Sequence, residues 1–460
     1  MDYNFKNLTP FPKDFLWGAS SSAYQCEGAY LEDSKGLSVA DVGKIPAGTT
    51  DFKDGVDHYH RFREDISLMA AMGLNEYRFS ISWTRIIPDG DGEVNPLGVQ
   101  HYHEVLNECH RYSIEPVVTL YHFDLPLELQ KKYGGWADRR CIDAFERYAR
   151  ICFKEYGDKV KYFLTINEQN IMILYQGAQY GSEKNKWQAN HNMLLAQAKA
   201  INACHELAPN SKIAPAPNIS AIYPASSSPE DYQAAMDYDQ IRNRLFLDTC
   251  IFGEYPESLF KWWEDRGVAP DIQEGDMELL ASAKPDFIAF NYYSAGTVRY
   301  ADEDEDFMVG IVSFPGMARV VQNDLQQLNS YGMGVDPIGL RVTLRQLWDR
   351  YHLPLIITEN GYGNRDILEA DGTIHDSGRI DYLRRHIIAC REAITDGVQL
   401  FGYSPWSAFD LISTHQGVTK RYGLIYVDRD EFDLKEMRRI PKDSFFWYKK
   451  VIKSNGEDLD

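Results

Sequence analysis

The sequence predicts an α/β protein folded as a single (β/α)8 TIM barrel over residues 1–460, and two observations support this prediction. Short runs that are apolar along their whole length alternate with longer amphipathic stretches. Such runs indicate the strands of a parallel sheet that is buried on both faces. Their number, eight, is typical of a closed barrel, a fold that often exceeds the usual length of one domain.

Eight runs are the expected barrel strands: Phe15–Ser20, Glu76–Ser82, Pro116–His122, Tyr162–Glu168, Ile213–Ile219, Phe287–Tyr293, Leu355–Glu359 and Leu400–Trp406. The helical patterns between them include Val56–Met72, Leu97–Tyr112, Arg140–Tyr156, Gln188–Leu207, Leu340–Tyr351 and Arg379–Thr395. No repeat of fixed period and no low-complexity linker divides the chain, so we expect one domain.

Polar or aromatic residues stand at the ends of these runs rather than at their starts. They are Arg78 and Ser80, His122, Asn167-Glu168, Asn291-Tyr292-Tyr293, Glu359-Asn360 and Trp406. The carboxyl ends of barrel strands form the catalytic face of this fold. We therefore expect these side chains to meet at one mouth of the barrel.

Charge and cysteine usage limit the partners and the compartment. The formal net charge of −20 disfavours nucleic acid and anionic membranes as partners. No uninterrupted apolar run is long enough for an ordinary membrane span. The seven cysteines form no CxxC pair, and Met1–Phe15 lacks the apolar core of a signal peptide. We expect reduced thiols and a cytoplasmic protein.

The sequence carries no pattern typical of a metal site, and no cofactor is expected. The acidic segments Ala301–Asp306 and Asp89–Gly92 lack the ligand spacing of a calcium loop. The pairs His58/His60 and His101/His103 are spaced so that the two side chains do not face each other on a helix. These histidines are better interpreted as structural or solvent-facing.

Glu168 and Glu359 are the candidate catalytic pair. Glycoside hydrolysis needs two carboxyl groups at the anomeric carbon, one to donate a proton and the other to attack or to activate water. Each glutamate follows an apolar strand, where an ionised carboxylate is costly to bury without partners. The fourth and seventh strands face each other across a closed barrel. A separation of about 5 Å would predict retention of configuration, and about 8 Å inversion.

Seven segments form a pattern that continues over most of the chain: Phe15–Ala19, Tyr24–Gly28, Tyr77–Trp83, Tyr121–Pro126, Thr165–Glu168, Phe290–Tyr293 and Ile357–Gly361. With these segments the chain resembles family 1 glycoside hydrolases from Phe11 to the terminal region. The resemblance implies that Glu168 is the general acid/base and Glu359 the nucleophile of a retaining β-glycosidase. It also implies that Arg78 and Tyr293 orient Glu359. The residues implied in binding the sugar are Gln25, His122 and Asn167 for its hydroxyls and Trp406 as the floor under its ring. Phe123 departs from the pattern, because many members have Trp there.

The segment after the eighth run indicates whether the bound sugar is plain or phosphorylated. Family members that act on plain sugars have a Glu-Trp pair there, whereas this chain has Ser413-Thr414. Ser413, Lys420 and Tyr422 match the phosphate-binding pattern of the 6-phospho-β-glycosidase branch. A hydroxyl, an ammonium and a phenol can all donate to a phosphate, which a carboxylate would repel. The alternative is that Lys420-Arg421 forms only a solvated basic turn.

The resemblance implies a small phosphorylated β-glycoside as the partner. Galactoside-specific members have Trp where this chain has Thr414, which favours 6-phospho-β-glucosides over 6-phosphogalactosides. Cellobiose phosphate and aryl-glucoside phosphates stay equally open, as does assembly into a homo-oligomer. Two rival functions also stay open: a β-glucosidase for unphosphorylated sugars, and a catalytically silent barrel that binds glycosides. The intact Glu168/Glu359 pair argues against the silent barrel.

Overall fold

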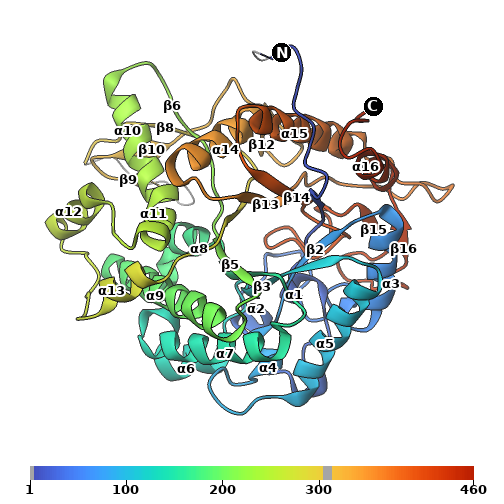
Figure 1. Cartoon of the computed structure of the whole chain (residues 1–460), viewed down its shortest axis with the longest axis horizontal. Coiled ribbons are helices and arrows are strands. Elements are labelled where there is room, and N and C mark those ends of the chain that lie inside the picture. Colours follow the sequence, from blue (N-terminus) through green and yellow to red (C-terminus); the bar gives the residue numbers. More distant parts are fainter. Residues whose placement is uncertain (1–4, 304–312) are drawn as a thin grey trace.

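Eight parallel strands form the centre of the computed structural model, which describes residues 5–303 and 313–460 (Figure 1). They are β1 (Leu16–Trp17), β2 (Glu76–Ser80), β3 (Glu115–Tyr121), β4 (Tyr162–Asn167), β5 (Lys212–Ala216), β7 (Ile288–Asn291), β13 (Leu355–Asn360) and β14 (Leu400–Pro405). The strands pair in two sets of four, β2-β3-β4-β5 and β1-β14-β13-β7.

Two isolated parallel bridges close these sets into a barrel. Ser20, just beyond β1, pairs with Arg78 of β2. Asn218, just beyond β5, pairs with Asn291 of β7. The strands therefore follow one another around the ring in chain order, and the predicted (β/α)8 barrel is confirmed. Each of the eight predicted runs overlaps one barrel strand, with boundaries that differ by a few residues.

Helices surround the strands, and all six predicted helical stretches are confirmed: α3 (His58–Met72), α5 (Pro96–Arg111), α7 (Arg140–Tyr156), α9 (Glu183–Leu207), α14 (Pro337–Tyr351) and α15 (Ser377–Thr395) (Figure 1). Capping sets several boundaries. Asn95 precedes Pro96 and accepts a hydrogen bond from the backbone of α5, a favoured way to begin a helix. Helix α9 begins earlier than the apolar pattern predicts, because Ser182 caps it through the backbone N–H of Asn185.

The interior of the barrel is a packed core rather than a pore. One buried cluster gathers side chains from five neighbouring strands and their approaches: Val117, Leu164, Ala214, Ala216, Phe287, Ala289 and Ile356. Alternation of inward side chains along each strand produces such layers. The filled interior leaves the carboxyl ends of the strands as the place for a site.

Shorter elements interrupt the strand–helix alternation. A second sheet has the order β6 (Ile222–Pro224), β8 (Gly296–Arg299), β10 (Ala318–Val320) and β9 (Ser313–Phe314). It neighbours α10 (Pro229–Asp239), which continues through the π-helical turn η4 (Gln240–Arg244) into α11 (Leu245–Phe252). Two hairpin-like pairs join β11 (Gln327–Leu328) to β12 (Gly334–Val335) and β15 (Ile425–Val427) to β16 (Arg439–Pro441). These strands are too short to carry a recognisable hydrophobic period.

The remaining helices are short pieces between the larger elements. They are α1 (Ala23–Cys26), η1 (Glu32–Ser34), α2 (Val39–Val42), α4 (Trp83–Ile86), α6 (Leu127–Tyr133), η2 (Gly135–Ala137), α8 (Gln169–Tyr175), η3 (Gly177–Tyr180), α12 (Glu257–Asp265), α13 (Asp276–Ser282) and α16 (Asp443–Lys453). All seven cysteines are buried free thiols, as expected. Within residues 5–303 and 313–460, no helix has both the length and the apolar character needed to cross a membrane.

Candidate active site

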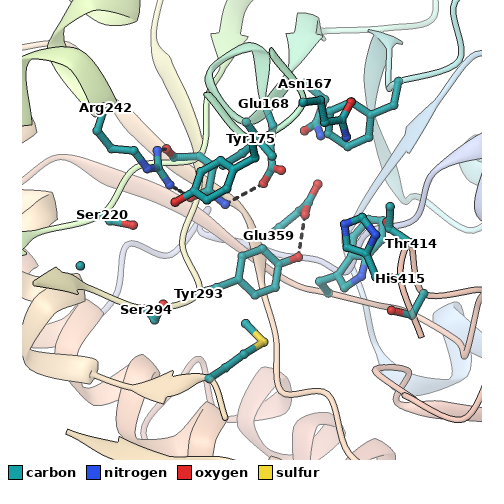
Figure 2. Close-up of a pocket in the computed structure, with 18 of the residues that line it drawn as sticks. Asn167, Glu168, Tyr175, Ser220, Arg242, Tyr293, Ser294, Glu359, Thr414 and His415 are labelled. Atoms are coloured by element: carbon teal, nitrogen blue, oxygen red, sulfur yellow. Dashed lines mark hydrogen bonds between the residues drawn. The ribbon is translucent and has the colours of Figure 1, made fainter. Parts of the chain in front are cut away.

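A cavity of about 500 Å³ opens at the carboxyl ends of the barrel strands (Figure 2). Ten of the eleven site residues predicted from the sequence line it: Gln25, His122, Asn167, Glu168, Tyr293, Glu359, Trp406, Ser413, Lys420 and Tyr422. The eleventh, Arg78, is fully buried and donates a hydrogen bond to Glu359. Residues that are hundreds of positions apart in the chain are thus brought together.

Glu359, at the end of β13, accepts hydrogen bonds on both carboxylate oxygens. Arg78 Nη1 donates to Oε1, and Tyr293 Oη donates to Oε2 at 2.7 Å. Arg78 is fixed in turn by Thr119 Oγ1, 2.9 Å from its Nε, and by Asn167 Oδ1, 2.6 Å from its Nη2. Burial raises the pKa of Glu359 to about 7, and the charge of Arg78 opposes this rise. Glu359 is therefore held in one orientation and ionises near neutral pH.

Glu168 follows β4 in a left-handed backbone conformation, with φ 45° and ψ 46°. This conformation is uncommon for a residue with a side chain, and here it forms the tight junction between β4 and α8. Glu168 Oε1 accepts hydrogen bonds from Asn218 Nδ2 at 2.8 Å and from Asn291 Nδ2 at 3.0 Å. The charge of Glu168 contributes to the raised pKa of Glu359, and Figure 2 shows the two carboxyl groups facing the same space.

His122, Asn167 and Trp406 form a connected wall of the cavity. Asn167 Oδ1 faces the guanidinium of Arg78, which can only donate, so the Asn167 amide N–H is directed to His122 Nε2 at 3.2 Å. Burial holds the pKa of His122 well below its usual range, so this ring is neutral. The His122 ring stacks on Trp406 with centroids 5.9 Å apart and planes 14° apart. These side chains are therefore ordered by the protein itself.

Gln25 is fixed at both ends of its amide group. Ser22 Oγ donates to Gln25 Oε1 at 2.7 Å, and Gln25 Nε2 donates to the main-chain oxygen of Ile412 at 2.7 Å. Ile412 directly precedes Ser413, so this contact joins helix α1 to the segment that carries the predicted phosphate residues.

Lys420 is a buried cation in this cavity, with 7% of its surface exposed. Its Nζ lies 3.3 Å from Met333 Sδ and 5.0 Å from the ring centroid of Tyr331. Within the described residues, no carboxylate forms an ion pair with Lys420, and neither Ser413 Oγ nor Tyr422 Oη donates to a protein acceptor. Burial lowers the pKa of Lys420 to about 8. An unpaired buried ammonium is costly, and an anionic ligand offsets that cost.

Known proteins are similar to this chain in sequence and in fold. The profile described as glycosyl hydrolase family 1 matches residues 7–457. The chain belongs to glycosyl hydrolase family 1. It is 45% identical to the aryl-phospho-beta-D-glucosidase BglC of Bacillus subtilis, with 98% of each chain covered. It is 40% identical to the 6-phospho-beta-glucosidase AscB of Escherichia coli, with 98% of this chain and 100% of AscB covered. The family 1 β-glucosidase of Thermotoga maritima, 35% identical, superimposes with a TM-score of 0.89 over 98% of this chain and 100% of that chain.

In this family 1 glycoside hydrolase, the neighbouring cations Lys420 and Arg421 face different surroundings. Arg421 is 4% exposed and donates to Asp410 Oδ2 at 2.8 Å and to the main-chain oxygen of Val427 at 2.9 Å. Lys420 instead lines the cavity. The alternative that the pair forms a solvated basic turn is wrong, because both side chains are buried. Arg421 is buried in an ion pair with Asp410, and Lys420 is buried at the cavity.

The histidines away from the cavity have other partners. His58 Nδ1 lies 2.8 Å from Asp65 Oδ2, and His101 stacks on Tyr59 with ring centroids 4.0 Å apart. His60 and His103 lie beside surface carboxylates. In the part of the chain that is described, no group of three or more His, Cys, Asp or Glu residues could hold a metal ion. Residues 304–306 of the acidic segment 301–306 lie outside that part.

The sequence prediction assigned no role to several residues that contact the candidate site. Asn218 is the last polar residue of the fifth predicted strand run, next to its end at Ile219, so its position alone could have identified it. Arg242 also lines the cavity, but it comes from the helical segment after β6, which carries no strand-end signal. Tyr331 and Met333, beside Lys420, come from the segment between β11 and β12, where no sequence pattern predicts a site.

Proposed function

We propose that this protein hydrolyses 6-phospho-β-glucosides to glucose 6-phosphate and the free aglycone, with retention of configuration and without a cofactor. The observation that carries this proposal is the buried Lys420 ammonium, which has no carboxylate partner among the described residues and lines the same cavity as Glu168 and Glu359. The relatives named aryl-phospho-beta-D-glucosidase and 6-phospho-beta-glucosidase support the same substrate class.

In the first half of the reaction, Glu359 attacks the anomeric carbon and forms an ester with it. The bond to the aglycone oxygen breaks, and that oxygen keeps the electron pair and takes the proton of Glu168. The donors Arg78 and Tyr293 suit Glu359 to this role, because both stabilise its ionised form. Glu168 has no cationic donor among the described residues, which suits a group that must carry a proton.

In the second half, water attacks the anomeric carbon and releases Glu359. Glu168, now a carboxylate, accepts the proton of that water. The carbon is thus inverted twice, so the configuration is retained. The two carboxyl groups supply all the acid, base and nucleophile chemistry that the reaction needs.

Ser413, Lys420 and Tyr422 bind the 6-phosphate in this proposal. All three can donate, and the ammonium of Lys420 adds a charge-assisted hydrogen bond to a phosphate oxygen. A protein with a net charge of −20 needs such a local cation to hold an anionic sugar. Gln25, His122 and Asn167 bind the sugar hydroxyls, and Trp406 lies under the ring.

Thr414 favours the glucoside over the galactoside, and the cavity wall that includes Tyr175 and Ser220 accepts the aglycone. The chain acts as one catalytic domain. The free buried thiols are compatible with a cytoplasmic location, where phosphorylated sugars are retained.

The test compares kcat/KM for p-nitrophenyl β-glucoside and for its 6-phosphate at moderate salt. A strong preference for the phosphorylated substrate supports the proposal. A preference for the plain glucoside favours the second candidate, a β-glucosidase such as the Thermotoga maritima enzyme of similar fold. Absence of turnover with both substrates and with their galacto epimers favours the silent barrel. Activity that persists unchanged in Glu359→Gln contradicts the catalytic assignment.

A further inference from the structure

The two carboxyl oxygens of Glu168 lie in unequal surroundings. Oε1 accepts N–H groups from Asn218 at 2.8 Å and from Asn291 at 3.0 Å. Within the described residues, no protein group bonds Oε2. An oxygen that already accepts two donors is a poor place for a proton, so the acidic proton of Glu168 belongs on Oε2.

The orientation of the Asn218 amide is set from its far side by Arg242. Arg242 Nη2 donates to Asn218 Oδ1 at 2.6 Å, and Arg242 Nη1 donates to the main-chain oxygen of Asn218. A guanidinium has no acceptor, so the oxygen of the Asn218 side chain must face Arg242. The NH2 group of that side chain then faces Glu168. Figure 2 shows the guanidinium of Arg242 directed toward Glu168, on the opposite side from Thr414 and His415.

Arg242 is held in place by an unusual helical turn and by a second asparagine. It lies in the π-helical turn η4, a deviation that often marks functional positions. Asn170 Nδ2 donates to the main-chain oxygens of Asn218 at 2.6 Å and of Arg242 at 3.0 Å. Arg242 is 5% exposed and forms no ion pair with a carboxylate among the described residues. Its charge is therefore compensated only by dipoles, of which the Asn218 amide is one.

We infer that Arg242 and Asn218 are positioning residues for the general acid: Arg242 orients the Asn218 amide, whose N–H occupies Oε1 of Glu168 and leaves the proton on Oε2, toward the glycosidic oxygen. As this proton moves to the aglycone, negative charge develops on Glu168. The N–H of Asn218, polarised by the cation behind it, stabilises that charge without rearrangement. The inference rests on the proposed role of Glu168 as the acid.

The leaving group of the substrate provides a selective test. A 2,4-dinitrophenolate departs with little help from an acid, whereas a phenolate needs a proton. In Arg242→Met we expect kcat/KM to fall about 10- to 100-fold on phenyl 6-phospho-β-glucoside and less than about 3-fold on the dinitrophenyl substrate, since general acid catalysis contributes about 10²- to 10⁴-fold. Loss of substrate binding or of general packing would lower both values together.

Two further variants keep the test decisive. Asn218→Asp keeps an acceptor for Arg242 but offers no N–H to Glu168, so it should show the same dependence on the leaving group even where Arg242→Met does not fold. Arg244→Gln is the matched control, because Arg244 lies in the same turn and pairs with Asp239 at 2.6 Å, away from Glu168. Arg244→Gln should leave both rates unchanged.

Glu168→Ala separates the acid role of Glu168 from the positioning roles of Arg242 and Asn218. A strong leaving-group dependence in Glu168→Ala, together with equal losses on both substrates in Arg242→Met and Asn218→Asp, overturns this inference and leaves the proposed function intact. Absence of the dependence in Glu168→Ala overturns the acid role of Glu168 itself.

Discussion

Lys420 lies over the ring of Tyr422, with its Nζ 5.3 Å from the ring centroid. The ring centroid of Tyr331 lies 5.0 Å from the same atom. Aromatic faces attract a cation but neutralise no charge. The ammonium is thus held in position by Tyr422 and Tyr331 while it stays available to an anionic ligand.

Replacement of Lys420 by Met should lower kcat/KM for the phosphorylated substrate only. The lost charge-assisted hydrogen bond is worth roughly 1.5–3 kcal/mol, or about 10- to 150-fold in kcat/KM. The assay compares p-nitrophenyl β-glucoside with its 6-phosphate. Lys132→Met, which removes a surface cation paired with Asp91, is the matched control and should change neither value. Equal losses on the two substrates in Lys420→Met would contradict the role of Lys420.

The affinity for glucose 6-phosphate should fall as the pH rises through about 8. Burial lowers the pKa of Lys420 to about 8, so this side chain is charged below that pH and neutral above it. A sugar phosphate has its second pKa near 6 and stays dianionic over the range. The inhibition constant of glucose 6-phosphate should rise about 10- to 30-fold from pH 7 to 9.5, as expected for loss of one proton near pH 8.

The inhibition constant of glucose serves as the control for this pH series, since glucose makes no contact that needs the charge of Lys420. It should change little over the same range. If both constants rise in parallel, the titrating group is not Lys420.

Gly363 is a second, indirect test of the phosphate pocket. A methyl group at this position would lie 2.4 Å from Lys420 Cε and 3.0 Å from Tyr422 Cζ. Since the end of a lysine side chain is flexible, Gly363→Ala should displace the ammonium rather than unfold the protein. We expect a selective loss, about 10-fold, on the phosphorylated substrate, within the range for one charged hydrogen bond. Gly372→Ala lies at an exposed turn with open space around it, but its φ of 86° strains any added side chain, so this variant controls for a general loss of stability through the ratio of the two substrates. An unchanged ratio in Gly363→Ala would show that the phosphate does not depend on the position of Lys420.

The sequence predicted the barrel and the cavity-lining residues because both depend on local signals. An apolar run identifies a strand, and a polar residue at its end, such as Glu168 or Glu359, is directed to the catalytic face by the fold itself. Ser413, Lys420 and Tyr422 were predicted from their match to a known phosphate-binding pattern, and they line the same cavity.

The supporting contacts could not be predicted in this way, because they depend on which distant segments meet. Arg242 reaches Asn218 only through the turn η4, and Met333 reaches Lys420 from a segment before α14. Nothing in the local sequence shows that Arg421 pairs with Asp410 while its neighbour Lys420 has no carboxylate partner among the residues that the structure describes. Burial and pairing are properties of the packed structure.

The ionisation of Glu359 gives the last prediction. Tyr293 Oη donates to Glu359 Oε2 at 2.7 Å, and this hydrogen bond lowers the pKa of the carboxyl group, which burial has raised to about 7. Glu359 must be ionised to attack, so kcat/KM should rise with pH through about 7. Removal of the donor in Tyr293→Phe should raise the pKa further and move this acid limb up by about one pH unit, since one unit is about 1.4 kcal/mol.

The measurement is the pH profile of kcat/KM for wild type and Tyr293→Phe on one phosphorylated substrate, so that ionisation of the phosphate affects both equally. Tyr292→Phe is the matched control, because Tyr292 Oη donates to the main-chain oxygen of Asp336 at 2.7 Å rather than to Glu359. Its acid limb should stay at the wild-type position. If kcat/KM of Tyr293→Phe is instead lower by the same factor at every pH, Tyr293 positions Glu359 or the substrate without stabilising the carboxylate anion. The electrostatic part of its proposed role would then be wrong.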